Sequence, residues 1–78
     1  MKIAIQTISG NKRAINVEPA TIYTIRQIKE QLFAMEGIQA DQQHILSSGK
    51  IIKDTETIES CNIADGQALH MILNLIGG

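Results

Sequence analysis

Aromatic residues and cysteines are scarce in this chain of 78 residues, which has one Phe, one Tyr, one Cys and no Trp. The single cysteine, Cys61, excludes an intramolecular disulfide. The first residues, Met1 to Gln6, alternate between apolar and polar side chains and lack the continuous apolar segment of a signal peptide. Because disulfides and signal peptides mark secreted proteins, we expect this protein in the cytoplasm and nucleus.

Long hydrophobic runs and clusters of positive charge are also missing. No stretch approaches the roughly 20 consecutive apolar residues of a membrane-spanning helix. The formal net charge is -1, and the seven Lys and Arg residues form no basic run. We therefore expect a protein that binds neither membrane nor nucleic acid.

The chain does have many aliphatic residues, mostly Ile and Leu, and 44% of it is hydrophobic. Its length allows one domain. Alternating apolar residues predict strands in residues 1–8, around Ile15 and Val17, in 44–47, at 51–52 and in 68–75. In the polar segment between the last two strands, Ile58 and Ile63 are the expected core anchors.

One helix is expected between the second and third strands. Ile25, Ile28 and Leu32 have the spacing of a single helical face. Thr24 is the expected N-cap, with Gln27 in place for a capping box, and Gly37 is the expected C-terminal stop. The order β-β-α-β-β-β with a single helix predicts an α+β fold, in which the helix covers one face of a β-sheet. The positions of Ile22, Tyr23 and Phe33 stay open between core and surface.

Strand alternation leaves several apolar residues on the solvent side. In the last strand Leu69, Met71, Leu73 and Leu75 share the face that should meet the helix. His70 and Ile72 share the other face, and Ile8 and Leu46 are expected there too. These four either form one apolar binding patch or are scattered surface residues of an ordinary kind.

The sequence predicts no enzyme. Cys61 has no supporting spacing to His44 or His70 for a nucleophile and base, and a lone cysteine is usually a small buried hydrophobe. The same residues lack the spacing of a metal site. We expect no catalytic residues, no metal and no cofactor.

The chain ends in Gly77-Gly78, directly after an apolar segment. Glycine lets a backbone pass through a narrow slot or approach another molecule closely. The dipeptide is either the tail on which an enzyme acts or a flexible linker.

The whole chain resembles ubiquitin and its modifier relatives. The matching segments are Met1-x-Ile3, Thr7-Ile8-x-Gly10, Val17-Glu18-Pro19, Thr24-Ile25, Lys29, Glu36-Gly37-Ile38, Asp41-Gln42-Gln43, Gly49-Lys50, Asn62-Ile63, Leu69-His70 and Gly77-Gly78. The resemblance implies a β-grasp domain over residues 1–76, with a mixed sheet packed on one helix, followed by a conjugation tail at 77–78.

The resemblance further implies a protein modifier. Activating and conjugating enzymes and ligases would join the carboxylate of Gly78 to target lysines, in an ATP-dependent sequence, and deconjugating proteases would reverse it. Ile8, Leu46, His70 and Ile72 align with the apolar recognition patch of the family. Lys50 aligns with its best-known chain-forming lysine, and is otherwise an ordinary turn lysine. We expect a monomer.

Departures from ubiquitin bear on which branch this is. The activating enzymes of the family distinguish branches at the position of Asn74, which is Arg in ubiquitin and Ala in the Nedd (Rub) type. Asn lacks the permanently charged fork of Arg, which argues against charging by ubiquitin's own enzyme. Further departures are Gln39-Ala40 for a Pro-Pro pair, and His44, Cys61, Asp65 and Ile76. Residues Ile28-Lys29-Glu30, Ser48 and Asp65-Gly66 favour the Nedd branch, whose expected targets are cullins.

Other functions stay open. The alternatives to a Nedd-type modifier are a divergent ubiquitin, a non-covalent docking domain of a larger protein, a sulfur carrier with the same type of tail, and a modifier that is no longer activated.

Overall fold

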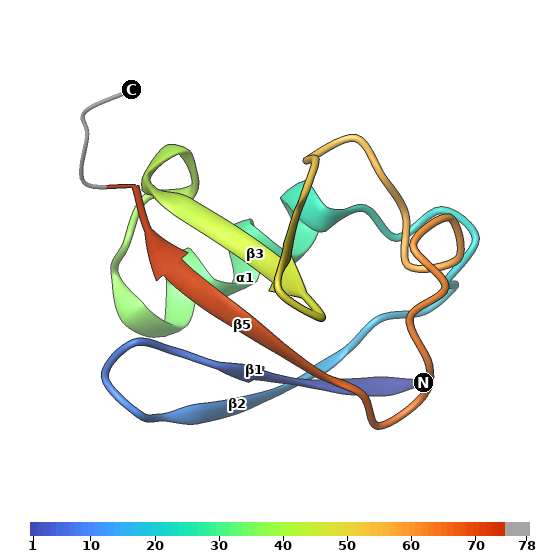
Figure 1. The fold of residues 1–78 in the computed structure, drawn as a ribbon, viewed down its shortest axis with the longest axis horizontal. Coiled ribbons are helices and arrows are strands. Elements are labelled where there is room, and N and C mark those ends of the chain that lie inside the picture. The colour runs from blue at the N-terminus through green and yellow to red at the C-terminus, as the bar shows by residue number, and fades with distance from the viewer. Residues whose placement is uncertain (75–78) are drawn as a thin grey trace.

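The computed structural model describes residues 1–74. Five strands and one α-helix follow one another in the predicted order, and a short 3-10 helix (η1), which was not predicted, lies between the α-helix and the third strand (Figure 1). Their bounds are β1 Lys2–Gln6, β2 Lys12–Asn16, α1 Ile25–Glu36, η1 Ala40–Gln42, β3 Gln43–Ser47, β4 Lys50–Ile52 and β5 Ala68–Leu73. The expected α+β class is confirmed, and β5 ends at Leu73, earlier than predicted; Leu75 lies outside the described residues.

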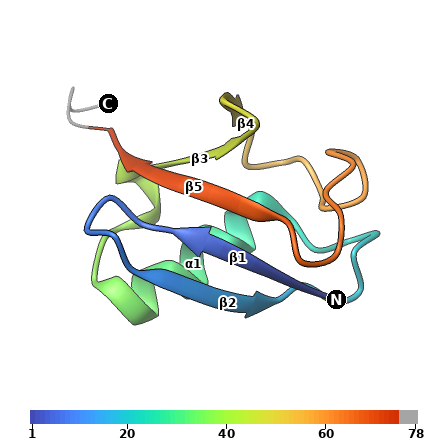
Figure 2. The same cartoon turned by 60° about the horizontal axis from the view of Figure 1, so that its bottom comes forward.

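The strands form one mixed sheet in the order β2-β1-β5-β3-β4. The pair β1–β5 is parallel, and the other three pairs are antiparallel. The last strand of the chain is therefore the central strand of the sheet. Figure 1 shows β5 between β1 and β3, and Figure 2 shows α1 on one side of the sheet. The β-grasp arrangement is confirmed.

The caps of α1 are those that the sequence predicts. The Thr24 N–H donates to Gln27 Oε1 at 2.8 Å, and the Gln27 N–H donates to Thr24 Oγ1 at 3.2 Å, which together form a capping box. Gly37 adopts the left-handed conformation, with φ 75°, and its N–H donates to Phe33 O at 2.8 Å. Within residues 1–74, no helix is long and apolar enough to cross a membrane.

The core lies between α1 and the inner face of the sheet, and it is almost entirely aliphatic. Tyr23 is the one aromatic side chain buried in it, whereas Ile22 and Phe33 are exposed, which settles the question that the pattern left open. The expected anchors Ile58 and Ile63 are buried. The aliphatic core residues are Ile3, Ile5, Ile15, Val17, Ile25, Ile28, Leu32, Ile45, Ile52, Ile58, Ile63, Leu69 and Met71. Each stabilises the fold by about 1.5–3 kcal/mol of transfer free energy before conformational entropy is subtracted.

The long segment between β4 and β5 forms hydrogen bonds with the N-terminal end of α1. The first N–H groups of a helix have no partner within it. Here the N–H of Ile25 donates to Glu56 O at 2.9 Å, and that of Arg26 donates to Asp54 O at 3.1 Å. A segment without regular secondary structure is therefore fixed by backbone hydrogen bonds at the helix N-terminus.

Lys29 is the buried charge of the helix, and the sequence pattern gave no sign of its burial. Its Nζ pairs with Asp54, which Arg26 Nη1 also contacts at 3.3 Å. Partial burial disfavours the Asp54 carboxylate, but the hydrogen bonds and charges of Lys29 and Arg26 outweigh this and lower the pKa of Asp54. A buried cation needs such a partner, because removing it leaves an uncompensated charge.

Replacing Asp54 by Asn should therefore destabilise the protein in a pH-dependent way. A carboxyl whose pKa is lowered by folding stabilises the fold above its unfolded pKa, and this contribution is lost as the pH falls through the folded value. We expect Asp54→Asn to unfold at lower urea concentration at pH 7, and the difference from the wild type to shrink below about pH 3.9. Urea titrations between pH 7 and acidic pH measure this difference in stability, and Glu59→Gln, at an exposed position, is the control. A difference independent of pH would contradict the role of the carboxylate charge.

Candidate functional site

Two of the predicted patch residues, Leu46 and His70, lie directly opposite each other on neighbouring strands. The antiparallel register of β3 and β5 pairs Leu46 with His70, and it pairs His44 with Ile72. Directly opposite residues share one face of a sheet. Because the alternating residue Met71 is buried against the helix side, these four side chains belong to the outer face.

The fourth predicted residue, Ile8, lies in the turn between β1 and β2 and is 57% exposed. Strands β1 and β5 are parallel, with Gln6 opposite His70. Ile8 follows Gln6 by two residues, as Ile72 follows His70. Figure 1 shows the β1–β2 turn at the same end of the sheet as the end of β5. We call Ile8, Leu46, His70 and Ile72 the apolar patch.

One further apolar residue, Ile51, extends this surface, and sequence reasoning did not assign it there. Ile51 pairs with Leu46 across β3 and β4 and is 59% exposed. The feature that places Ile51 on this surface is the two-residue turn Ser48-Gly49, whose φ angles of 52° and 81° are both positive. Such turns connect adjacent antiparallel strands in a fixed register, so the turn places Ile51 on the face of Leu46.

The outer face has no negative charge of its own in the strands that the structure describes. Its charged residues are lysines, among them Lys2 and Lys12, and it also carries His44 and His70. The acidic residues are Glu18, Glu30, Glu36, Asp41, Asp54, Glu56, Glu59 and Asp65, none of which is in a strand. The strands therefore present apolar, neutral polar and cationic side chains on this face, and no carboxylate.

Lys50 is the first residue of β4 and is exposed. Among the ion pairs of residues 1–74, none involves Lys50. A pocket of about 350 Å³ lies beside it, lined by Ser47, Ser48, Lys50, Ile51, Ile52, Glu56 and Cys61. The lysine amine is therefore accessible at the edge of the apolar surface.

Cys61 is half-buried and packs against the core from this pocket. Burial raises the pKa of its thiol, and the charge of Glu56 raises it further, while a hydrogen bond with Ser60 opposes both. This direction is opposite to the one that makes a cysteine nucleophilic. Within residues 1–74, no group of three His, Cys, Asp or Glu residues is arranged to hold a metal ion.

Asn74 lies directly after β5, at the last described position. Its N–H donates to Gln42 O at 2.7 Å, which fixes the backbone there to the end of η1. This bond uses no side-chain atom, so the fold does not require Asn at this position. The predicted conjugation tail, Gly77 and Gly78, lies outside the described residues, as does Ile76 before it.

Comparison with known proteins finds relatives that match the chain from end to end. NEDD8-like protein RUB1 of Saccharomyces cerevisiae is 31% identical over 78 residues, which are 100% of this chain and 99% of that protein. Ubiquitin-like protein NEDD8 of Dictyostelium discoideum is 33% identical over 78 residues, with the same shares of the two chains.

A relative of another type is the ubiquitin domain-containing protein DSK2 of Saccharomyces cerevisiae. It is 38% identical over 73 residues, and this match covers 92% of the chain but only 19% of DSK2. A model of the ubiquitin family matches residues 3–76. The chain therefore belongs to the ubiquitin family.

Proposed function

We propose that this protein is a ubiquitin-like modifier, joined through its C-terminal glycine to lysines of target proteins, and that it is of the Nedd type with cullin-like targets. Its partners are then the activating, conjugating and ligase enzymes of a modifier pathway, together with deconjugating proteases. The proposed locations are the cytoplasm and nucleus.

The proposed chemistry needs only a carboxylate from this chain. The Gly78 carboxylate attacks the α-phosphate of ATP, which gives an acyl-adenylate and releases pyrophosphate. A cysteine thiolate of the activating enzyme then displaces AMP and forms a thioester. After transfer to a conjugating enzyme, the amine of a target lysine displaces the thiolate and forms an isopeptide bond. The enzymes supply the catalytic groups, and this chain supplies recognition.

The observation that carries the proposal is the apolar patch, in which Ile8 and Ile72 are exposed and Leu46 is partly buried, close to Asn74 at the end of β5. Ile72 is the second residue before Asn74 in the sequence, and Leu46 is on the strand that pairs with β5. An enzyme that holds the tail at Asn74 therefore meets an apolar surface on the same strand. Large exposed apolar side chains on a small domain are typical of binding surfaces.

The Nedd branch is supported by the end-to-end similarity to two NEDD8-like proteins. It is also supported by the absence of Arg at position 74, since Asn removes the charged fork that ubiquitin presents there. Divergent ubiquitin is the alternative within the same chemistry.

A non-covalent docking domain is the second candidate function. The similarity to DSK2 favours it, because there the matched part is 19% of a much longer protein. Such a domain would use the apolar patch and would have no need of Gly77-Gly78. The two functions differ in whether the tail reacts.

An activation assay distinguishes these functions. With ATP and purified Nedd-type activating enzyme, we expect a thiol-sensitive adduct on a non-reducing gel, because a thioester is cleaved by added thiol. The chain without Gly77-Gly78 should give no adduct and should melt at an unchanged temperature. No adduct with either the Nedd-type or the ubiquitin-type enzyme would exclude the modifier and favour the docking domain.

Substitution of Asn74 should change the choice of activating enzyme. Asn74→Arg restores a bidentate cationic fork, and we expect kcat/KM with the ubiquitin-type enzyme to rise by about tenfold, which corresponds to about 1.4 kcal/mol. Asn74→Ala should retain activity with the Nedd-type enzyme. Both variants keep the N–H that binds Gln42, so an unchanged melting temperature is the control. Equal kcat/KM values for the wild type, Asn74→Arg and Asn74→Ala with each enzyme would show that neither enzyme recognises the side chain at position 74.

Truncation of Leu46 should weaken partner binding without unfolding the domain. Leu46→Ala removes a side chain of the apolar patch, and we expect affinity for the activating enzyme to fall by about fivefold or more. Its cost in stability should be about 1 kcal/mol or less, as for other surface substitutions. The adjacent Ile45 is fully buried, so Ile45→Ala should cost about 2–5 kcal/mol. Similar losses for both variants in urea unfolding would place Leu46 in the core.

A further inference from the structure

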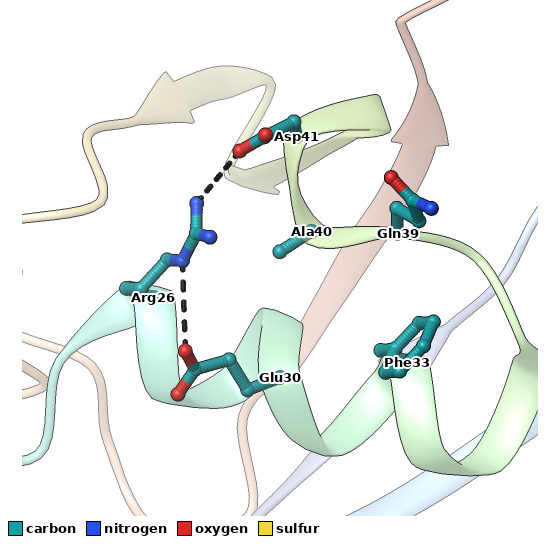
Figure 3. Close-up of a pocket in the computed structure, with 6 residues that line it drawn as sticks. All are labelled: Arg26, Glu30, Phe33, Gln39, Ala40 and Asp41. Atoms are coloured by element: carbon teal, nitrogen blue, oxygen red, sulfur yellow. Dashed lines mark hydrogen bonds and ion pairs between the residues drawn. The ribbon is translucent and has the colours of Figure 1, made fainter.

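A second surface feature lies away from the apolar patch, between α1 and the segment that follows it. It is a pocket of about 250 Å³ lined by Arg26, Glu30, Phe33, Gln39, Ala40 and Asp41 (Figure 3). Figure 3 shows Arg26 with Glu30 and Asp41 at one end, and Phe33 at the other, with Ala40 between them. The pocket therefore has a charged end and an apolar end.

The apolar end is formed by the one phenylalanine of the chain. Phe33 is 50% exposed, whereas Tyr23, the other aromatic residue, is buried in the core. An aromatic ring at the mouth of a pocket provides both apolar contact area and a negatively polarised face that attracts cations. Phe33 is thus placed for contact with another molecule.

The charged end has more negative than positive charge. Arg26 is shared by three carboxylates: Nη1 lies 2.9 Å from Asp41 and 3.3 Å from Asp54, and Nε lies 3.7 Å from Glu30. Lys29 is bound to Asp54 as well. Two cations therefore face three carboxylates, which leaves one negative charge in excess. The side chains of Glu30 and Asp41 are 62% and 83% exposed, so they remain accessible to a further cation.

We propose that this pocket receives a lysine or arginine side chain of a partner protein. The aliphatic stem lies against Phe33 and Ala40, and the cationic end meets the carboxylates of Glu30 and Asp41. The excess negative charge would repel an anionic group, and Arg26 cannot offset this repulsion because it is already paired with three carboxylates. A purely apolar side chain would desolvate these carboxylates and give them no partner beyond Arg26, which they already share.

The identity of the partner follows from where the pocket lies, and this part rests on the proposed function. Asp41, on the wall of the pocket, is followed by Gln42, whose carbonyl accepts the N–H of Asn74. Residues 39–42 thus connect the pocket with the base of the tail. A protein that holds the chain at Asn74 is bound next to the segment that forms one wall of the pocket, so the proposed partner is an enzyme that handles the tail.

The chemistry of the pocket is tested without any enzyme. In NMR titrations, N-acetyl-arginine methylamide should shift the amides of Glu30, Phe33 and Asp41, and it should bind about fivefold more tightly than N-acetyl-norleucine methylamide. The double variant Glu30→Gln, Asp41→Asn should abolish the difference between the probes, while Arg26 keeps Asp54 as its partner. Glu59→Gln, an exposed carboxylate elsewhere, is the matched control. Equal binding of the two probes, or no effect of the double variant, would overturn the proposal.

The partner is tested in the activation assay. Phe33→Ala and the double variant should each raise the KM for the modifier by about fivefold and leave kcat unchanged, because the reacting carboxylate is that of Gly78. Glu59→Gln should change neither. An unchanged KM would overturn the assignment of the partner. A wild-type chain that forms no adduct would instead overturn the proposed function and that assignment together, while the titration still decides what the pocket binds.

Discussion

The placement of the last strand, β5, in the middle of the sheet is the constraint on which both the core and the candidate site depend. Its register with β1 and β3 buries Leu69 and Met71 and leaves His70 and Ile72 on the outer face. Because side chains alternate along a strand, a shift of one residue would exchange these two pairs. The burial of the first pair therefore also fixes the position of the second, and core packing determines the geometry of a surface site.

The distribution of charge separates the two sides of the molecule. The strands contain no carboxylate, and the carboxylates of the chain lie in α1, in η1 and in the loops. On the helix side, carboxylates are needed to compensate the buried Lys29 and to bind Arg26. On the outer face no such demand exists, so it stays apolar and weakly cationic. The apolar patch and the pocket beside Phe33 thus differ in the chemistry that each presents at the surface.

Much of this arrangement was predictable from local patterns, and the rest depends on contacts between distant residues. Thr24, Gln27 and Gly37 mark the helix ends because capping is local. The patch residues followed from strand alternation and from family resemblance. Ile51 was missed because its face depends on the register of β4, and Lys29 because its burial depends on a segment 25 residues away in sequence. The pocket could not be predicted, since two elements with no shared periodicity form it.

Several of the departures from ubiquitin fall where the fold makes few demands. At Asn74 the structure uses the backbone N–H alone, so the fold leaves the side chain at this position free to vary. Gln39 and Ala40 lie at the surface in the wall of a pocket, and His44 lies on the outer face, where β3 pairs with β5 through backbone atoms. Such positions change at little cost in stability, because they remove no core contact. Surface positions in a domain of this size are therefore able to diverge while the core stays aliphatic.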